Sequence, residues 1–169
     1  MELYRWYILK YGAYALLTVA LFRLQSIPGL LEIGGVRPLP VAALAILVAT
    51  MERELPGVLF CIFCGYLCDL YGVAPMGFYM LFLTILGLAA GLVIRNYLQS
   101  SLPIIMAAFF CRLVLFLFRY PLAGVTGAAP VLLRYDLPHA VYSAVLAVPL
   151  YYPVRALHRM AEERTDTRL

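Results

Sequence analysis

The chain has 169 residues, of which 64% are hydrophobic and 13% charged, and its mean hydropathy is +0.91. Soluble domains carry about 45–50% apolar and about 25% charged residues, and a chain of this size cannot hide so much apolar surface from water. The composition therefore excludes an ordinary soluble domain, and the net charge of +4 is too small to indicate a nucleic-acid partner. The apolar runs are continuous and do not alternate as barrel strands do, so we predict an all-α integral membrane protein.

Turns rich in glycine, proline and charged residues divide the chain into about six apolar segments within a single polytopic domain. The expected spans are 6–24, 38–51, 55–70, 76–94, 103–118 and 137–154. The second is short, because its residues cover about 21 Å of a hydrocarbon core about 30 Å thick. A re-entrant hairpin of the second and third segments is less favoured, since it would bury Glu52, Arg53 and Glu54 in the bilayer. From Arg155 onward the chain is charged, and we expect a frayed tail.

Basic residues set the expected orientation. With a cytoplasmic N-terminus, the larger share of the 13 Lys and Arg residues falls in cytoplasmic segments. The positive-inside rule therefore predicts that both termini are cytoplasmic. Arg112 lies near the middle of 103–118, and if this segment did not span, the C-terminus would lie outside.

The third segment carries a stripe of small residues on one face. Residues spaced four apart share one face of a helix, and here they are Gly57, Cys61, Gly65 and Asp69. Small residues let a neighbouring helix approach closely in lipid. The turn that follows ends one helix and starts another, and it contains Gly72, Pro75 and Gly77. We therefore expect 57–77 to be the packing centre of the protein.

A second close-approach motif lies in 76–94, where Gly87 and Gly91 are four residues apart. Alanines at positions 42, 45 and 49 give the second segment a similar face. Such motifs predict helix–helix contact without naming the partner. We expect these small-residue faces to be exposed for the binding of other helices.

Asp69 is the one acid embedded in an apolar run, and a carboxylate at membrane depth needs a partner. Arg112 and Arg119 in the fifth segment are both within reach, because a long arginine can extend up or down by several ångströms. An ion pair that locks the two helices together is the favoured interpretation. Capping of the turn at Gly72, and an ion or proton relay, are the alternatives.

No constellation of catalytic or cofactor-binding residues emerges from the sequence. Three cysteines share one apolar helix, and a four-ligand zinc site would need Cys111 to converge on them from the fifth segment. Small-residue packing explains Cys61, Cys64 and Cys68 better than a metal does. Nucleotide-binding loops, metalloprotease motifs and nucleophile elbows are missing. We therefore expect neither an enzyme nor a cofactor.

The pattern at the end of the third segment resembles that of the bacterial rod shape-determining MreD family. It runs from Gly65 to Asp69 at a helix end, through a turn with Gly72 and Pro75, to a helix beginning at Gly77. The resemblance covers about residues 37–90. Met76 and the cysteine-rich third segment depart from the usual family pattern.

The resemblance implies a non-enzymatic scaffold of the cell-elongation machinery in the cytoplasmic membrane. It implies association with the bitopic protein MreC, and through it with MreB filaments and the RodA–penicillin-binding-protein synthase of peptidoglycan. It also implies a fold similar to the substrate-binding subunits of energy-coupling-factor transporters. The alternative function is that of such a vitamin-capturing subunit, but the first segment has no two alanines four apart of the kind those subunits commonly present.

Overall fold

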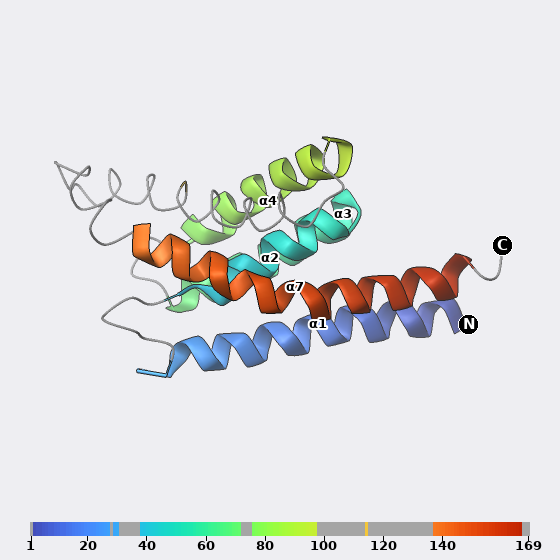
Figure 1. Ribbon diagram of the computed structural model, residues 1–169, viewed down its shortest axis with the longest axis horizontal. Coiled ribbons are helices and arrows are strands. Elements are labelled where there is room, and N and C mark those ends of the chain that lie inside the picture. The colour runs from blue at the N-terminus through green and yellow to red at the C-terminus, as the bar shows by residue number, and fades with distance from the viewer. Residues whose placement is uncertain are drawn as a thin grey trace.

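The computed structural model describes residues 2–27, 29–30, 38–71, 76–97, 114 and 137–166. Within these ranges every regular element is an α-helix, in the order α1 (Glu2–Ser26), α2 (Pro40–Met51), α3 (Glu54–Tyr71), α4 (Phe78–Tyr97) and α7 (Leu137–Asp166). Helices α1 and α7 run side by side, with the N-terminus of one near the C-terminus of the other (Figure 1). The all-helical prediction is confirmed for this part of the chain.

Two of the described helices are long and apolar enough to cross a membrane, judged by length and composition. They are Tyr7–Ser26 within α1 and Leu137–Met160 within α7. Shorter apolar helices occupy Pro40–Met51 and Phe78–Ile94. The fifth predicted span, 103–118, lies outside the described residues except for position 114.

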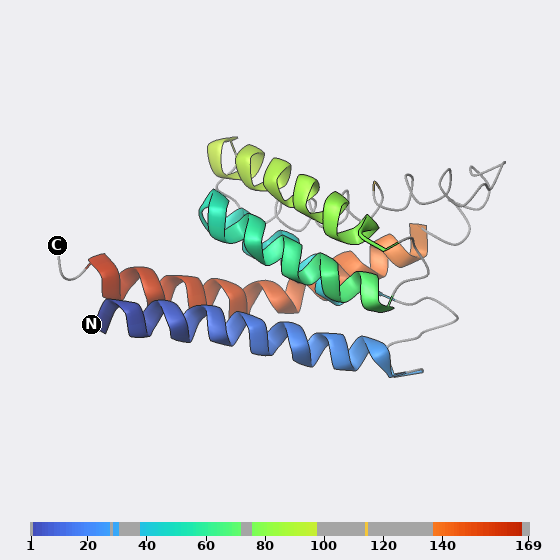
Figure 2. The same cartoon turned by 180° about the vertical axis from the view of Figure 1, so that it is seen from behind.

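Helix α2 is the packing centre of the described fold. Every residue from Pro40 to Thr50 is buried, and α2 contacts each of the other four helices. A helix that is apolar on all sides is typical of a protein core or of a membrane span. Of the predicted packing centre, 57–77, the residues in α3 pack against both α2 and α4, and 72–75 lie outside the described residues. The short second segment is enclosed by protein, with α3 and α4 covering it on one side (Figure 2).

Local chemistry explains where the central helices begin and end. Pro40 occupies the first turn of α2, where its missing N–H costs no helical bond. The N–H of Leu39, just before it, donates to Ser143 Oγ of α7 at 3.3 Å. Gly77 has φ of +92°, a conformation that favours glycine, and its carbonyl accepts from the N–H of Leu81 in the first turn of α4.

The C-terminal helix is longer than the sequence analysis predicted. We expected the sixth helix to end near Val154 and the tail to fray, but α7 continues to Asp166. At this end α1 and α7 extend past α3 and α4 (Figure 1). The charged tail remains helical because it packs beside α1 and because His158 joins the polar contact described below.

Candidate functional site

The predicted stripe on α3 lies inside the three-helix unit formed by α2, α3 and α4. A methyl group added to Gly57 would lie 3.2 Å from the Cα atom of Ala49 on α2. One added to Gly65 would lie 2.5 Å from the Cα atom of Met80 on α4. These positions are glycine because a neighbouring backbone occupies the space that a side chain would need. The stripe therefore holds α3 against two helices at once.

The glycines of α4 complete the same contact from the opposite side. A methyl group on Gly91 would lie 2.7 Å from the carbonyl oxygen of Ala49, and one on Gly87 would collide with Cys61 Sγ. Cys61 Sγ lies 3.6 Å from the carbonyl oxygen of Ala45, to which it donates. The small faces expected to be exposed for partners are buried against one another, so that part of the prediction was wrong. The physical reason is that each small-residue face packs against another helix of the same chain.

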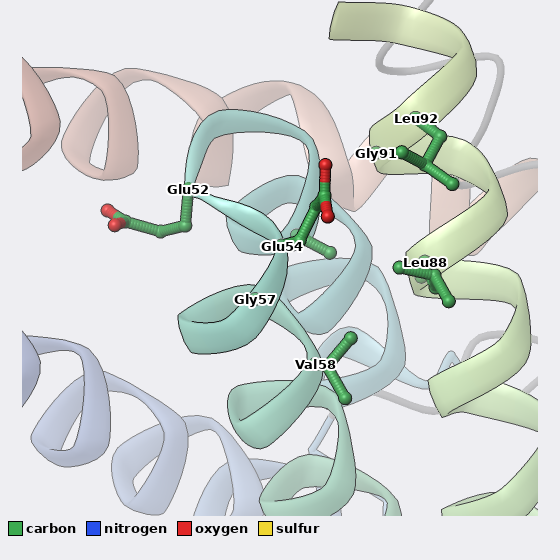
Figure 3. Close-up of a pocket in the computed structure, with 9 residues that line it drawn as sticks. Glu52, Glu54, Gly57, Val58, Leu88, Gly91 and Leu92 are labelled. Carbon is green, nitrogen blue, oxygen red and sulfur yellow. The ribbon is translucent and has the colours of Figure 1, made fainter.

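A narrow cleft remains between α3 and α4 beyond these contacts. Gly57 and Val58 line it from α3, and Leu88, Gly91 and Leu92 line it from α4 (Figure 3). Figure 3 also shows that Glu54 lies on the α4 side, whereas the side chain of Glu52 points away from α4.

Asp69 caps the start of α4. Its Oδ1 atom accepts from the N–H of Tyr79 at 2.8 Å, and its Oδ2 atom accepts from Gly77 and Met80, each at 3.1 Å. A carboxylate at a helix N-terminus binds the N–H groups that have no helical partner and complements the helix dipole. This side chain thereby fixes the angle of the α3–α4 hairpin. The candidate partners Arg112 and Arg119 lie outside the described residues, as do Gly72 and Pro75.

The cysteines of α3 line its buried side. Cys61, Cys64 and Cys68 are all buried. Their spacing keeps them on the side of α3 that faces the protein interior, where a small, soft side chain fits between helices. Cys111 lies outside the described residues.

A buried polar cluster, which we define as Lys10, Tyr11, Tyr14, Glu52 and His158, joins three separate parts of the chain. Glu52, in the turn between α2 and α3, forms an ion pair with Lys10 of α1 through Oε1. The hydroxyl of Tyr14 donates to Oε1 at 3.3 Å and that of Tyr11 donates to Oε2 at 3.2 Å. From α7, Nδ1 of His158 lies 3.1 Å from the same Oε1 atom. One carboxylate thus ties α1 and α7 to the α2–α3 turn.

Because the cluster is buried, the loss of one of its members should cost a large part of the folding free energy. Lys10 is 6% exposed and Glu52 is 5% exposed, so water can do little to replace a missing partner. Burial by itself would raise the pKa of Glu52, but hydrogen bonds from His158 and Lys10, and their charges, hold that pKa below its ordinary value. The carboxylate is therefore ionised at neutral pH and accepts from Lys10, Tyr11 and Tyr14.

Tyr14 connects the polar cluster to the apolar core. It is fully buried, and its ring lies 5.9 Å from that of Phe60 on α3, measured between centroids. Tyr11 packs edge-on against Tyr14 at 6.3 Å. A tyrosine can serve both surroundings because its ring is apolar and its hydroxyl finds an acceptor.

Sequence reasoning missed this cluster. Its members come from distant parts of the chain: 106 residues separate His158 from Glu52, and 148 separate it from Lys10. One signal was available, since Lys10 stands inside an aromatic and apolar run and a buried ammonium needs a carboxylate.

Comparison with known proteins identifies the family. The family described as rod shape-determining protein MreD matches residues 7–161, which is nearly the whole chain and includes the polar cluster, the α3 stripe and Asp69. Searches among curated proteins and among solved structures found no significant match. Because the family match covers α1 to α7, the chain belongs to the rod shape-determining MreD family and is a membrane protein that acts in rod-shape determination.

Proposed function

We propose that the chain is a non-enzymatic, multi-pass scaffold of the cell-elongation machinery in the bacterial cytoplasmic membrane. In this proposal it binds an MreC-like bitopic protein and through it helps to organise MreB filaments and the RodA–penicillin-binding-protein synthase. The family match over residues 7–161 carries the proposal. It also favours this function over that of a vitamin-capturing transporter subunit.

The polar cluster supports a topology with both termini in the cytoplasm. Glu52 of the α2–α3 turn contacts Lys10 in the N-terminal half of α1 and His158 in the C-terminal half of α7. These two halves lead to the end of the molecule at which both chain termini lie (Figure 1). The α2–α3 turn therefore lies on the same side as the termini. Because the larger share of basic residues belongs to that side in the proposed topology, the positive-inside rule predicts that it is cytoplasmic.

Affinity purification from native membranes tests the partner assignment. The tagged full-length chain is extracted in a mild detergent, and every co-purifying protein is identified by mass spectrometry. We expect a protein with a single span, a coiled coil and an extracytoplasmic domain, together with cell-wall synthases. An ATPase pair with a transmembrane coupling protein would overturn the scaffold and favour vitamin capture.

Accessibility of two exposed positions at opposite ends of the helices tests the orientation. Leu30 follows α1, and Arg53 lies in the α2–α3 turn. With a membrane-impermeant maleimide on intact spheroplasts, Leu30→Cys should react at once, whereas Arg53→Cys should react only after permeabilisation. The wild-type chain measures the background from native cysteines. The reverse pattern would contradict cytoplasmic termini.

A further inference from the structure

His158 lies where α1, α7 and the α2–α3 turn meet, and its Nδ1 atom faces two partners of opposite kind. Lys10 Nζ lies 3.2 Å from Nδ1, and Glu52 Oε1 lies 3.1 Å from the same atom. An ammonium group can only donate a hydrogen bond, and a carboxylate can only accept one. Both partners compete for a single ring nitrogen.

A ring nitrogen of histidine carries either a proton or a lone pair in the ring plane, so Nδ1 can bond only one of these partners at a time. Without a proton, Nδ1 accepts from Lys10. With a proton, it donates to Glu52. The protonation state of this atom therefore decides whether Nδ1 bonds Lys10 of α1 or Glu52 of the α2–α3 turn.

The charged and titratable groups around the imidazole come from each element packed there. Lys10 of α1 and Glu52 of the turn contact the imidazole, and Tyr11 and Tyr14 of α1 donate to the same carboxylate. On α7 itself the neighbouring charged residues in the sequence are Arg155 and Arg159. A charged imidazole would lie 3.2 Å from the Lys10 ammonium, which repels it, and 3.1 Å from the Glu52 carboxylate, which attracts it. Lys10 has a long, flexible side chain that can withdraw toward the helix end.

We propose that His158 is a proton-controlled link at the cytoplasmic end of the helices. When Nδ1 is unprotonated, His158 bonds to Lys10 and ties α7 to α1. When the imidazole takes up a proton, it donates to Glu52, ties α7 to the α2–α3 turn and displaces the Lys10 ammonium from the ring.

Nitrogen-15 NMR of the imidazole tests this link in the full-length chain in lipid nanodiscs. The chain has two histidines, and the signals of His158 are those lost in His158→Gln. At high pH we expect Nδ1 to give the signal of an unprotonated, hydrogen-bond-accepting nitrogen. As the pH falls, it should become protonated and show a hydrogen bond to a carboxylate. A wild-type Nδ1 that carries a proton at every pH would overturn the proposal.

Two variants separate the link from a general change at the site. Lys10→Met removes the competing donor, so the neutral imidazole should reverse its tautomer and hold its proton on Nδ1, facing Glu52. Tyr11→Phe is the matched control, because it removes a donor to Oε2 and leaves both partners of Nδ1 in place. It should keep the wild-type tautomer. An unchanged tautomer in folded Lys10→Met would refute the competition, and if that variant does not fold, the wild-type titration decides.

Discussion

Replacement of Gly65 by alanine tests whether the three-helix unit is held by direct backbone contact. The new methyl group would lie 2.5 Å from Met80 Cα, 2.8 Å from Met80 N and 2.8 Å from the carbonyl oxygen of Tyr79. All three are backbone atoms, so no side-chain rotation relieves the overlap. To restore the 3.4 Å of an ordinary contact from 2.5 Å, α4 must move away by about 0.9 Å.

That movement also breaks the cap on α4. The bonds from Asp69 to the N–H groups of Gly77, Tyr79 and Met80 are 2.8–3.1 Å long, and a shift of this size carries them beyond hydrogen-bonding distance. Overpacking of a tight site costs about 1–3 kcal/mol, and each lost hydrogen bond to a charged group costs about 1.5–3 kcal/mol. We expect Gly65→Ala to lower the free energy of unfolding by at least about 3 kcal/mol.

The assay is equilibrium unfolding in mixed micelles with an increasing fraction of a denaturing detergent, followed by circular dichroism. Gly12→Ala is the matched control, because nothing lies within 4 Å of the added methyl group on α1. Alanine is the better helix former by about 1 kcal/mol, so the control should be as stable as the wild type or more stable. If both variants unfold at the same detergent fraction, the backbone-contact explanation is refuted.

Three further predictions concern the α4 contact, the Asp69 cap and the buried carboxylate. Gly91→Ala should lower the unfolding midpoint in mixed micelles more than Gly87→Ala, because the first meets a backbone oxygen and the second a cysteine sulfur that can turn away; the opposite order would contradict this. Asp69→Leu removes the cap at a cost of about 0.5–2 kcal/mol and should lower the thermal midpoint more than Asp69→Asn, which keeps one acceptor oxygen; equal midpoints would argue against the cap. Glu52→Gln leaves the Lys10 ammonium buried without its counter-charge and should cost about 3–5 kcal/mol in unfolding free energy. Because the folded pKa of Glu52 lies below the ordinary 4.5, the contribution of this side chain to the free energy of unfolding is complete above about pH 4.5 and is lost as the pH falls through the folded pKa. If the wild-type chain and Glu52→Gln had the same acid-unfolding profile, this role of the carboxylate would be disproved.

The ends of the central helices could be predicted from the sequence because local chemistry sets them. Pro40 begins α2, and glycine at position 77 precedes α4, so the predicted segments 38–51 and 76–94 lie close to the observed Pro40–Met51 and Phe78–Tyr97. Spacing by four also placed Gly57 and Gly65 on one face of α3. Each of these inferences needs only residues that are near one another in the chain.

Partners in space could not be predicted in the same way. Spacing along one helix shows that Gly91 allows a close approach, but it does not show that Ala49 of α2 makes that approach. The role of Glu52 was missed for the same reason, since a carboxylate in a turn ordinarily faces water. Only the arrangement of three helices brings Lys10 and His158 to it.

The order in which the helices are synthesised determines when the polar cluster can form. Lys10 enters the membrane with the first helix, and its ammonium has to wait for Glu52 to be synthesised before the ion pair can form. His158 emerges 106 residues after Glu52, and at about 5–20 residues per second the ribosome needs several seconds to reach it. A chain stalled before α7 can therefore hold the first ion pair but cannot complete the cluster. The polar cluster is complete only when α7 has packed against α1 and the α2–α3 turn.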